Sequence, residues 1–185
     1  MRIVIDPGHG GSDPGAVCGN LREADLTLKL AKLMVEKVAP PATIILTRRE
    51  DQDVSLSERV RIANYHNADL FLSLHFNAGG GRGFESYVYP SAPPLTRYYR
   101  QILHAAATGF LLPQGTRDRG GKEAPFYVLR YTRMPAVLLE CLFLDHPEDA
   151  RLLSQDGFLE ALATAIAQGI SVLRREKELL RKFLG

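Results

Sequence analysis

The sequence predicts one α/β domain built on a mixed, mostly parallel sheet of about six strands with helices on both faces, an α/β/α sandwich. Strand-like apolar runs alternate with amphipathic helical patterns, which is typical of a sheet covered by helices on both sides. The 185 residues suffice for one well-packed domain, and 45% hydrophobic with 24% charged residues is an ordinary globular composition. No internal repeat or long linker divides the chain.

The helices are indicated by apolar spacing and by capping residues. Leu26, Leu30 and Met34 recur at one-turn intervals, and the helix that they predict ends before the two prolines at 40–41. Residues 55–58 (SLSE) form a capping box, which opens a second helix that runs to about residue 66. Further helices are expected at residues 94–110, from Pro147 as a first helical residue, and from about residue 158 onward.

The strands are indicated by short apolar runs between turn residues. We expect them at residues 2–6, 43–47, 69–75, 84–89, 126–129 and 136–144. The runs at 69–75 and 136–144 are apolar on both faces, as in a sheet that is covered on both sides. The glycine-rich stretches 8–19 and 79–83 and the polar stretch 111–123 are expected to be loops.

Charge, cysteine content and hydropathy exclude several classes of protein. A net charge of +2 is too small to indicate a nucleic-acid partner, and no apolar run reaches the ~20 residues that cross a bilayer. Cys18 and Cys141 form neither a disulfide framework nor a four-cysteine zinc site; we expect Cys141 in the core and Cys18 as a free thiol.

No signal-peptide pattern begins the chain. We therefore expect a chain that is made in the cytoplasm or cut from a longer secreted protein.

Three side chains are expected to meet where strands end and a helix begins. His9 follows the first strand, His75 ends the third, and Glu23 precedes Leu26 by three residues on the sheet-facing side of the first helix. Ligands bind at the carboxyl ends of strands in open α/β sheets, and two imidazoles with one carboxylate match a catalytic zinc site. Spacing alone leaves alternatives open: strand-end histidines that only form hydrogen bonds, and a glutamate that only favours a helix N-terminus.

Glu140 lies within the apolar strand at 136–144. A carboxylate buried on both faces of a sheet is costly unless it is paired, hydrogen-bonded or close to a metal ion. Its pKa is expected to be raised, which suits a general base or acid near neutral pH. The alternative is a structural ion pair with an arginine from the 117–130 region.

Several blocks of the sequence resemble one family, the zinc-dependent N-acetylmuramoyl-L-alanine amidases of the amidase-3 type. The resemblance extends from about residue 2 to 169. The matching blocks are residues 3–11 (IVIDPGHGG), 13–15 (DPG), Glu23, 46–48 (LTR), 55–60 (SLSERV), 63–64 (AN), 68–78 (ADLFLSLHFNA), 126–130 (FYVLR) and 135–140 (PAVLLE). Two positions depart from the family pattern: Leu142 stands where relatives often carry glycine, and Asp145–His146 replaces a usual Ser-Asn pair.

The resemblance implies a zinc hydrolase-like fold, one Zn²⁺ per chain held by His9, Glu23 and His75, and Glu140 as the catalytic carboxylate. It implies hydrolysis of the amide between the lactyl group of N-acetylmuramic acid and L-alanine of the peptidoglycan stem peptide. Asn77 is expected either to contact substrate or only to shape its turn. Asp6 is expected either to orient a ligand or to cap the glycine-rich loop.

Two alternatives to the amidase are a zinc peptidase that cleaves the stem peptide itself and a wall-binding module without catalysis. The cellular setting also has two alternatives. The chain would act as a phage-type lysin released to the wall, or as a fragment of a secreted host enzyme. In either setting we expect a monomer with peptidoglycan as its partner.

The C-terminal segment carries most of the positive charge. We expect residues 1–172 to form the catalytic domain and 173–185 to form a basic amphipathic helix extension. Five basic and two acidic residues lie between Arg174 and Leu184. Either this helix packs on the domain with a solvated outer face, or it makes weak contact with anionic wall polymers or membranes.

Overall fold

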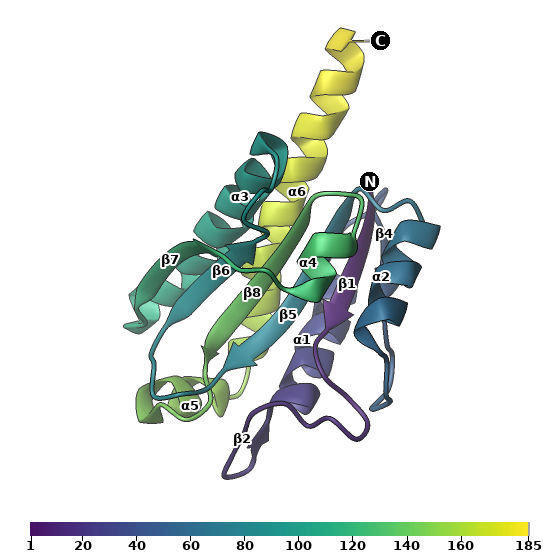
Figure 1. The fold of residues 1–185 in the computed structure, drawn as a ribbon. Coiled ribbons are helices and arrows are strands. Elements are labelled where there is room, and N and C mark those ends of the chain that lie inside the picture. The colour runs from purple at the N-terminus through teal and green to yellow at the C-terminus, as the bar shows by residue number, and fades with distance from the viewer. Residues whose placement is uncertain (185) are drawn as a thin grey trace.

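The computed structural model describes residues 1–184 and contains a six-stranded sheet (Figure 1). The strands are β1 (Arg2–Pro7), β4 (Thr43–Leu46), β5 (Leu70–Asn77), β6 (Phe84–Val88), β7 (Asp118–Glu123) and β8 (Ala136–Phe143). They lie in the order β4-β1-β5-β8-β6-β7. β4, β1, β5 and β8 are parallel, whereas β6 runs antiparallel to β8 and parallel to β7. The predicted mixed, mostly parallel sheet is confirmed.

Six α-helices accompany the sheet in the described residues. They are α1 (Glu23–Lys37), α2 (Leu56–Tyr65), α3 (Pro94–Leu111), α4 (Tyr127–Tyr131), α5 (Pro147–Leu153) and α6 (Phe158–Leu184). A short hairpin of β2 (Val17–Cys18) and β3 (Leu21–Arg22) precedes α1, and a 3₁₀ turn, η1 (Leu112–Gln114), follows α3. α1, α3 and α6 cover one face of the sheet, and α2 and α4 lie on the other (Figure 1). Helices on both faces are thereby confirmed.

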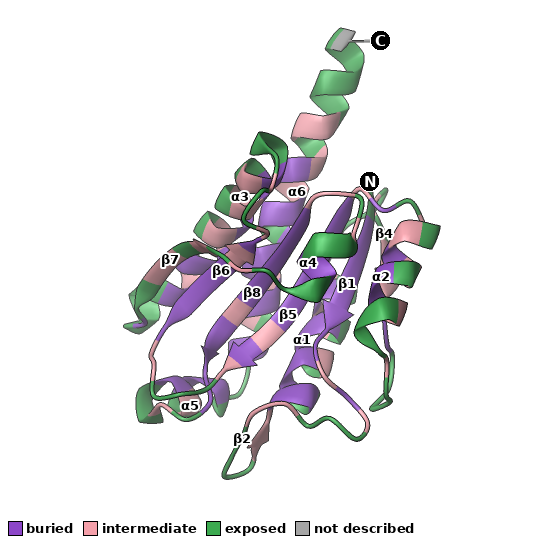
Figure 2. Ribbon diagram, viewed as in Figure 1, coloured by how far each residue is buried: buried purple, intermediate pink, exposed green. Residues whose placement is uncertain are grey.

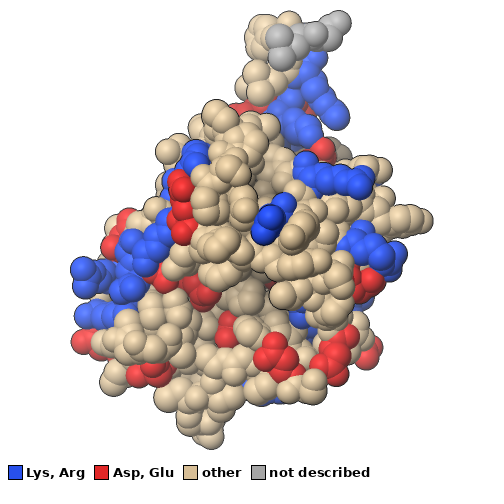
Figure 3. All heavy atoms as spheres, viewed as in Figure 1, with Lys and Arg blue, Asp and Glu red and all other residues tan. Residues whose placement is uncertain are grey.

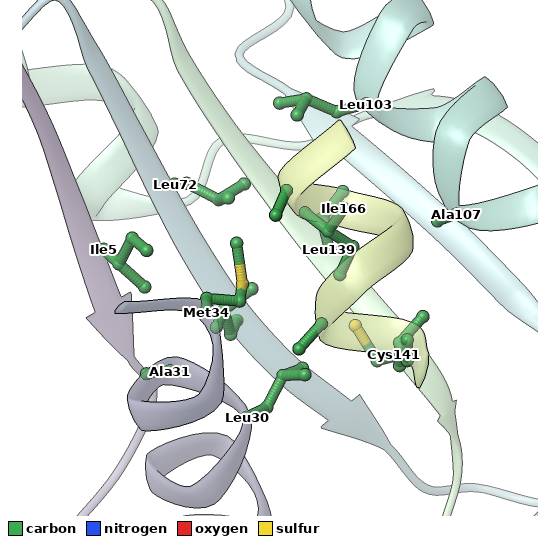
Figure 4. Close-up of a cluster of buried hydrophobic side chains, with 14 of the residues drawn as sticks. Ile5, Leu30, Ala31, Met34, Leu72, Leu103, Ala107, Leu139, Cys141 and Ile166 are labelled. Carbon is green, nitrogen blue, oxygen red and sulfur yellow. The ribbon is translucent and has the colours of Figure 1, made fainter. Parts of the chain in front are cut away.

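The larger core lies between the sheet and helices α1, α3 and α6 (Figure 4). Alternation along each strand decides which side chains enter it, because successive residues of a strand point to opposite faces. Leu139 and Cys141 of β8 face this core, and Cys141 is fully buried there as predicted (Figure 4). Leu138 and Glu140 consequently face α2 and α4. Buried residues line most of the central strands, whereas the outer surfaces of α2 and α4 are exposed (Figure 2).

Two local predictions are wrong, both between α3 and β8. Residues 126–129 are not a strand, because Tyr127–Tyr131 form helix α4. Val128 and Leu129 are both buried in the same hydrophobic cluster. Adjacent residues can share one side of a helical turn, whereas in a strand they point to opposite faces. The stretch 111–123 is not only a loop, because its last six residues form β7. β7 carries no apolar side chain and is held by backbone pairing with β6, so hydrophobic periodicity gave no sign of it.

The other helix boundaries agree with the prediction to within a few residues. Ser55 caps α2 by accepting a hydrogen bond from the Glu58 backbone N–H at 3.2 Å, and Pro147 occupies the first turn of α5. α6 continues without a break across residues 172 and 173. Among residues 1–184, no single helix is both long and apolar enough to span a bilayer; α5 and α6 meet the criterion only together, bent by 86°.

Candidate metal centre

The carboxyl ends of β1 and β5 and the start of α1 bring His9, Glu23 and His75 together. One potential ligand atom from each of the three lies within 4.8 Å of the others. His9 Nε2 and His75 Nδ1 each lie 3.0 Å from the same oxygen, Oε1 of Glu23. These are the three residues that the sequence predicted as a metal site, and they form a candidate metal-binding triad.

Glu23 is the buried centre of this triad. Its Oε1 also accepts a hydrogen bond from the Phe76 backbone N–H at 3.0 Å, and its Oε2 accepts one from the Ala16 N–H at 2.9 Å. Burial by itself would raise the pKa of Glu23, but the hydrogen bonds from His75 and His9 outweigh it and hold the pKa well below its usual range. The side chain is therefore an anion that is oriented by four donors.

His9 is held between two carboxylates. Its Nε2 donates to Glu23, and its Nδ1 donates to Oδ2 of Asp13 at 2.8 Å. Partial burial disfavours the imidazolium, but Glu23 and Asp13 together raise the pKa of His9 to about 9. In metal sites, the histidine nitrogen that does not bind the metal commonly donates to a carboxylate. This hydrogen bond fixes the orientation of the histidine ring. Asp13 lies in the DPG block but was not singled out by the sequence analysis.

Two buried arginines hold the loop that carries His9. Arg48 is 1% exposed and donates to the carbonyl oxygens of Pro7 (3.0 Å), Gly8 (2.9 Å) and Ala24 (2.7 Å). Arg59 donates to the carbonyl oxygens of Pro7 (2.7 Å) and of His9 itself (2.8 Å). Because Ala24 directly follows Glu23, Arg48 ties the His9 loop to the start of α1. Neither arginine was identified as a site residue from the sequence.

Two glycines allow the ligand side chains to approach the loop closely. A Cβ atom on Gly8 would lie 2.3 Å from the ring of His75. A Cβ atom on Gly15, where φ is +65°, would lie 2.5 Å from Oε2 of Glu23. The glycine-rich loop is therefore shaped around the triad.

Asp6 lies on β1, shortly before His9 in the chain, and is 1% exposed. Its carboxylate accepts hydrogen bonds from the hydroxyls of Thr47 (2.6 Å) and Ser73 (2.8 Å) and from the guanidinium of Arg59 (2.7 Å). Through Arg59 it reaches the carbonyl of His9. Asp6 therefore supports the His9 loop through Arg59. Among residues 1–184 it makes no hydrogen bond to the side chains of His9, Glu23 or His75.

Glu140 is the register partner of His75 on the adjacent parallel strand β8. Its Oε2 is buried and has no hydrogen-bond partner among residues 1–184. Burial is the main reason that the pKa of Glu140 is raised to about 7. The alternative was an ion pair between Glu140 and an arginine from the 117–130 region. The described residues do not form this pair. Arg119, which lies in that region, pairs with Glu85 instead (2.8 Å).

Glu85 is a second buried carboxylate beside Glu140 and was not predicted from the sequence. The two are register partners on the antiparallel strands β6 and β8. Besides Arg119, Glu85 accepts hydrogen bonds from Asn77 Nδ2 (2.8 Å), the Tyr87 hydroxyl (2.9 Å) and Lys122. Asn77 also accepts a hydrogen bond from the Ala78 backbone N–H at 2.8 Å, so it both shapes its turn and joins this cluster.

The fold agrees with comparisons to known proteins. A family model described as N-acetylmuramoyl-L-alanine amidase (Amidase_3) matches residues 3–172. The chain belongs to the N-acetylmuramoyl-L-alanine amidase family. It is 44% identical to the N-acetylmuramoyl-L-alanine amidase CwlM of Bacillus licheniformis over 174 residues, which cover 92% of this chain and 68% of that protein. It is 41% identical to the endolysin of Bacillus phage SPP1 over 181 residues, 95% of this chain and 67% of that protein.

Solved amidase structures share the whole architecture. An N-acetylmuramoyl-L-alanine amidase from Clostridium difficile 630 superposes with a TM-score of 0.89 at 32% identity, covering 95% of this chain and 97% of the other. The catalytic domain of CwlV, an amidase from Bacillus (Paenibacillus) polymyxa var. colistinus, gives a TM-score of 0.85 at 32% identity, with 94% and 98% covered. The resemblance inferred from the sequence blocks is confirmed.

The two departures from the amidase pattern lie beside the site. Leu142 has a φ of +92° and is fully buried, at the point where the register of β5 and β8 shifts after His75 and Glu140. A positive φ explains why glycine is favoured at this position, because side chains with a Cβ rarely adopt it. Asp145 accepts hydrogen bonds from the backbone N–H groups of Gly79 (2.7 Å) and Gly80 (2.8 Å), so it anchors the loop after β5.

Proposed function

We propose that this chain is a zinc-dependent amidase that hydrolyses the bond between the lactyl group of N-acetylmuramic acid and L-alanine of the stem peptide. Membership of the N-acetylmuramoyl-L-alanine amidase family supports the reaction. The observation that carries the mechanism is the convergence of His9, Glu23 and His75 next to Oε2 of Glu140, which has no hydrogen-bond partner in the described part of the chain.

The donor set fits zinc. Two imidazole nitrogens and one carboxylate oxygen are the ligands found in catalytic zinc sites, which keep a further position open for water or substrate. In the proposed site, His9, His75 and Glu23 would hold one ion per chain. When bound there, zinc polarises the amide carbonyl and makes a water molecule a stronger acid.

The residues around the ion have separate tasks in this proposal. Asp13 keeps the proton on Nδ1 of His9, so that Nε2 is the nitrogen that binds the metal. Glu140 Oε2 takes a proton from the attacking water and delivers it to the nitrogen of the departing L-alanine. A raised pKa near neutrality suits both steps, because the same group must first accept and then donate a proton.

Asp6 and Asn77 act indirectly in this proposal. Asp6 keeps Arg59 in place, and Arg59 holds the carbonyl of His9. Asn77 donates to Glu85 and thereby fixes the wall of the site beside Glu140. Both are positioning residues, and neither is required to touch the reacting atoms.

One digestion assay separates the amidase from its alternatives. Purified peptidoglycan is incubated with the chain alone, with a chelator, and with the chelator followed by zinc. New L-alanine amino termini that are lost with the chelator and restored by zinc are the expected result. New termini within the peptide would identify a peptidase of the stem, and binding without any new terminus would identify a wall-binding module.

The chain acts on the cell wall, and its similarity to the phage SPP1 endolysin supports a lysin-type setting. The alternative setting, a catalytic part of a secreted host enzyme, is supported equally by the similarity to CwlM. We propose that the chain works as a monomer on peptidoglycan. Weak contact with anionic wall polymers would come from exposed α6 residues such as Arg175, Arg181 and Lys182.

A further inference from the structure

The candidate metal centre is flanked by two surfaces of different composition. Toward α2, His9 borders a cavity of about 400 Å³ whose charged lining is Asp6, Asp13 and Asp53 against the single arginine Arg59. Toward β6 and β7 the charged side chains are of both signs: Glu85 lies on β6, and β7 carries Asp118, Arg119, Lys122 and Glu123. Figure 3 shows blue and red side chains intermingled at that edge. The β6 and β7 side is therefore distinguished by which of its cations keep free hydrogen-bond donors and not by its net charge.

The β6 and β7 side begins with Glu85, one strand beyond Glu140. Glu85 is 2% exposed, and it collects donors from four half-buried side chains: Asn77, Tyr87, Arg119 and Lys122. Burial opposes its charge, but these donors keep the pKa of Glu85 below its usual range. Glu85 is consequently an anion that anchors the donors around it.

The two cations of this cluster lie beside two carboxylates. Arg119 and Lys122 both pair with Glu85, and Glu140 is the register partner of Glu85 on β8. Arg119 uses only its Nε on Glu85, and neither of its Nη atoms donates to a residue between 1 and 184. The guanidinium lies over the ring of Phe143, with Cζ 4.9 Å from the ring centroid, which fixes its plane.

Two neighbouring arginines on the same edge are engaged elsewhere. Arg82 pairs with Glu148, and Arg97 pairs with Glu123. Arg119 therefore differs from them in having its position set by a buried residue while two of its donors stay available. Such a preorganised guanidinium favours a carboxylate, which it binds through two parallel hydrogen bonds.

We propose that Arg119 and Lys122, anchored by Glu85, bind a free carboxylate of the stem peptide next to the L-alanine that is released. The peptide then extends over β6 and β7, and the glycan side of the scissile amide lies toward the cavity beside α2. The inference rests on the proposed amidase function and adds the direction in which the substrate lies. The chemical class recognised is an acidic peptide whose second residue carries its carboxylate within reach of Arg119.

The test compares two soluble substrates that differ only in that carboxylate: N-acetylmuramoyl-L-alanyl-D-glutamate and the corresponding isoglutamine amide. For the unchanged chain, kcat/KM for the acid is expected to exceed that for the amide by about tenfold, as expected for a charge-assisted hydrogen bond. Arg119→Gln and Lys122→Gln are each expected to reduce this ratio toward one. The ratio is measured within one preparation, so a partly unfolded variant does not distort it.

Arg117→Gln is the matched control, because Arg117 is an exposed arginine two residues from Arg119 that makes no side-chain hydrogen bond within residues 1–184. It removes the same charge and is expected to retain the preference for the acid. Equal kcat/KM for acid and amide in the unchanged chain would overturn the carboxylate site and leave the amidase function standing. Equal loss on both substrates in Arg119→Gln would also overturn it. Failure to cleave purified peptidoglycan would instead overturn the amidase function.

Discussion

His75 and Glu140 are register partners on the neighbouring parallel strands β5 and β8, and both side chains point to the face covered by α2 and α4. The sheet thus sets a potential metal ligand and a buried carboxylate side by side on two rigid strands. Their separation depends on backbone pairing and not on a flexible loop, which is the kind of support that a catalytic pair requires.

Glu140→Gln is expected to lower amidase turnover by at least about 10²-fold, because the amide cannot accept and return a proton. Zinc content, measured by atomic absorption, should stay at one ion per chain, since this substitution leaves the three ligands in place. Thermal stability should change little, because Oε2 of Glu140 has no hydrogen-bond partner in the described residues to lose. Glu178→Gln, on the exposed part of α6, serves as the control. Activity retained by Glu140→Gln would contradict the assigned role.

Removal of zinc is expected to lower the melting temperature as well as the activity. Binding to the folded state alone stabilises it by about 4 kcal/mol when the free ion is at 1,000 times its Kd, which is on the order of 10 °C for a chain of this size. Differential scanning fluorimetry with a chelator, and then with excess zinc, measures the shift. The melting temperature of His9→Ala should change with neither the chelator nor zinc. A zinc-dependent shift of the same size in that variant would place the ion elsewhere.

Arg48→Lys is expected to weaken zinc binding by about tenfold to a hundredfold, the range found when groups that orient metal ligands are changed. Lysine keeps the positive charge but cannot reach the carbonyl oxygens of Pro7, Gly8 and Ala24 together, so the His9 loop and α1 lose their common support. Competition with a fluorescent zinc chelator measures the affinity. Arg49→Lys, at the exposed neighbouring position, should leave it unchanged. If Arg48→Lys lowered the melting temperature but left the zinc affinity unchanged, Arg48 would contribute to folding and not to the orientation of the metal ligands.

The part of α6 beyond Lys177 is expected to attract anionic wall polymers. Leu173 is buried and Lys177 pairs with Asp69, so removal of everything after Val172 would disturb the fold; exposed charges make a cleaner test. Arg181→Glu with Lys182→Glu should weaken sedimentation with purified walls several-fold at low salt and have little effect at high salt, because exposed charges are screened. The control reverses Lys29 and Lys32, which are exposed on α1. An identical salt profile for both double variants would remove any special role for α6.

The fold class, most elements and the candidate residues of the triad could be predicted from the sequence. Strands with continuous apolar runs and helices with one-turn spacing are local patterns, so β5, α1 and α3 could be predicted from their own residues. His9 and His75 could be found because each lies at the end of a predicted strand. Glu140 stood out because a carboxylate inside an apolar strand has a cost that needs an explanation.

The surroundings of those residues depend on how distant parts of the chain pack together. Glu85 looks like an ordinary polar position of an alternating strand until β6 pairs antiparallel with β8 and places it beside Glu140. β7 has no hydrophobic signal because its stability comes from backbone pairing at a sheet edge. Arg48 binds carbonyl oxygens whose positions depend on where β1, β4 and α1 meet. These contacts join residues far apart in sequence, and such pairings are set by packing of the whole chain, whereas a strand or helix pattern is set by its own side chains.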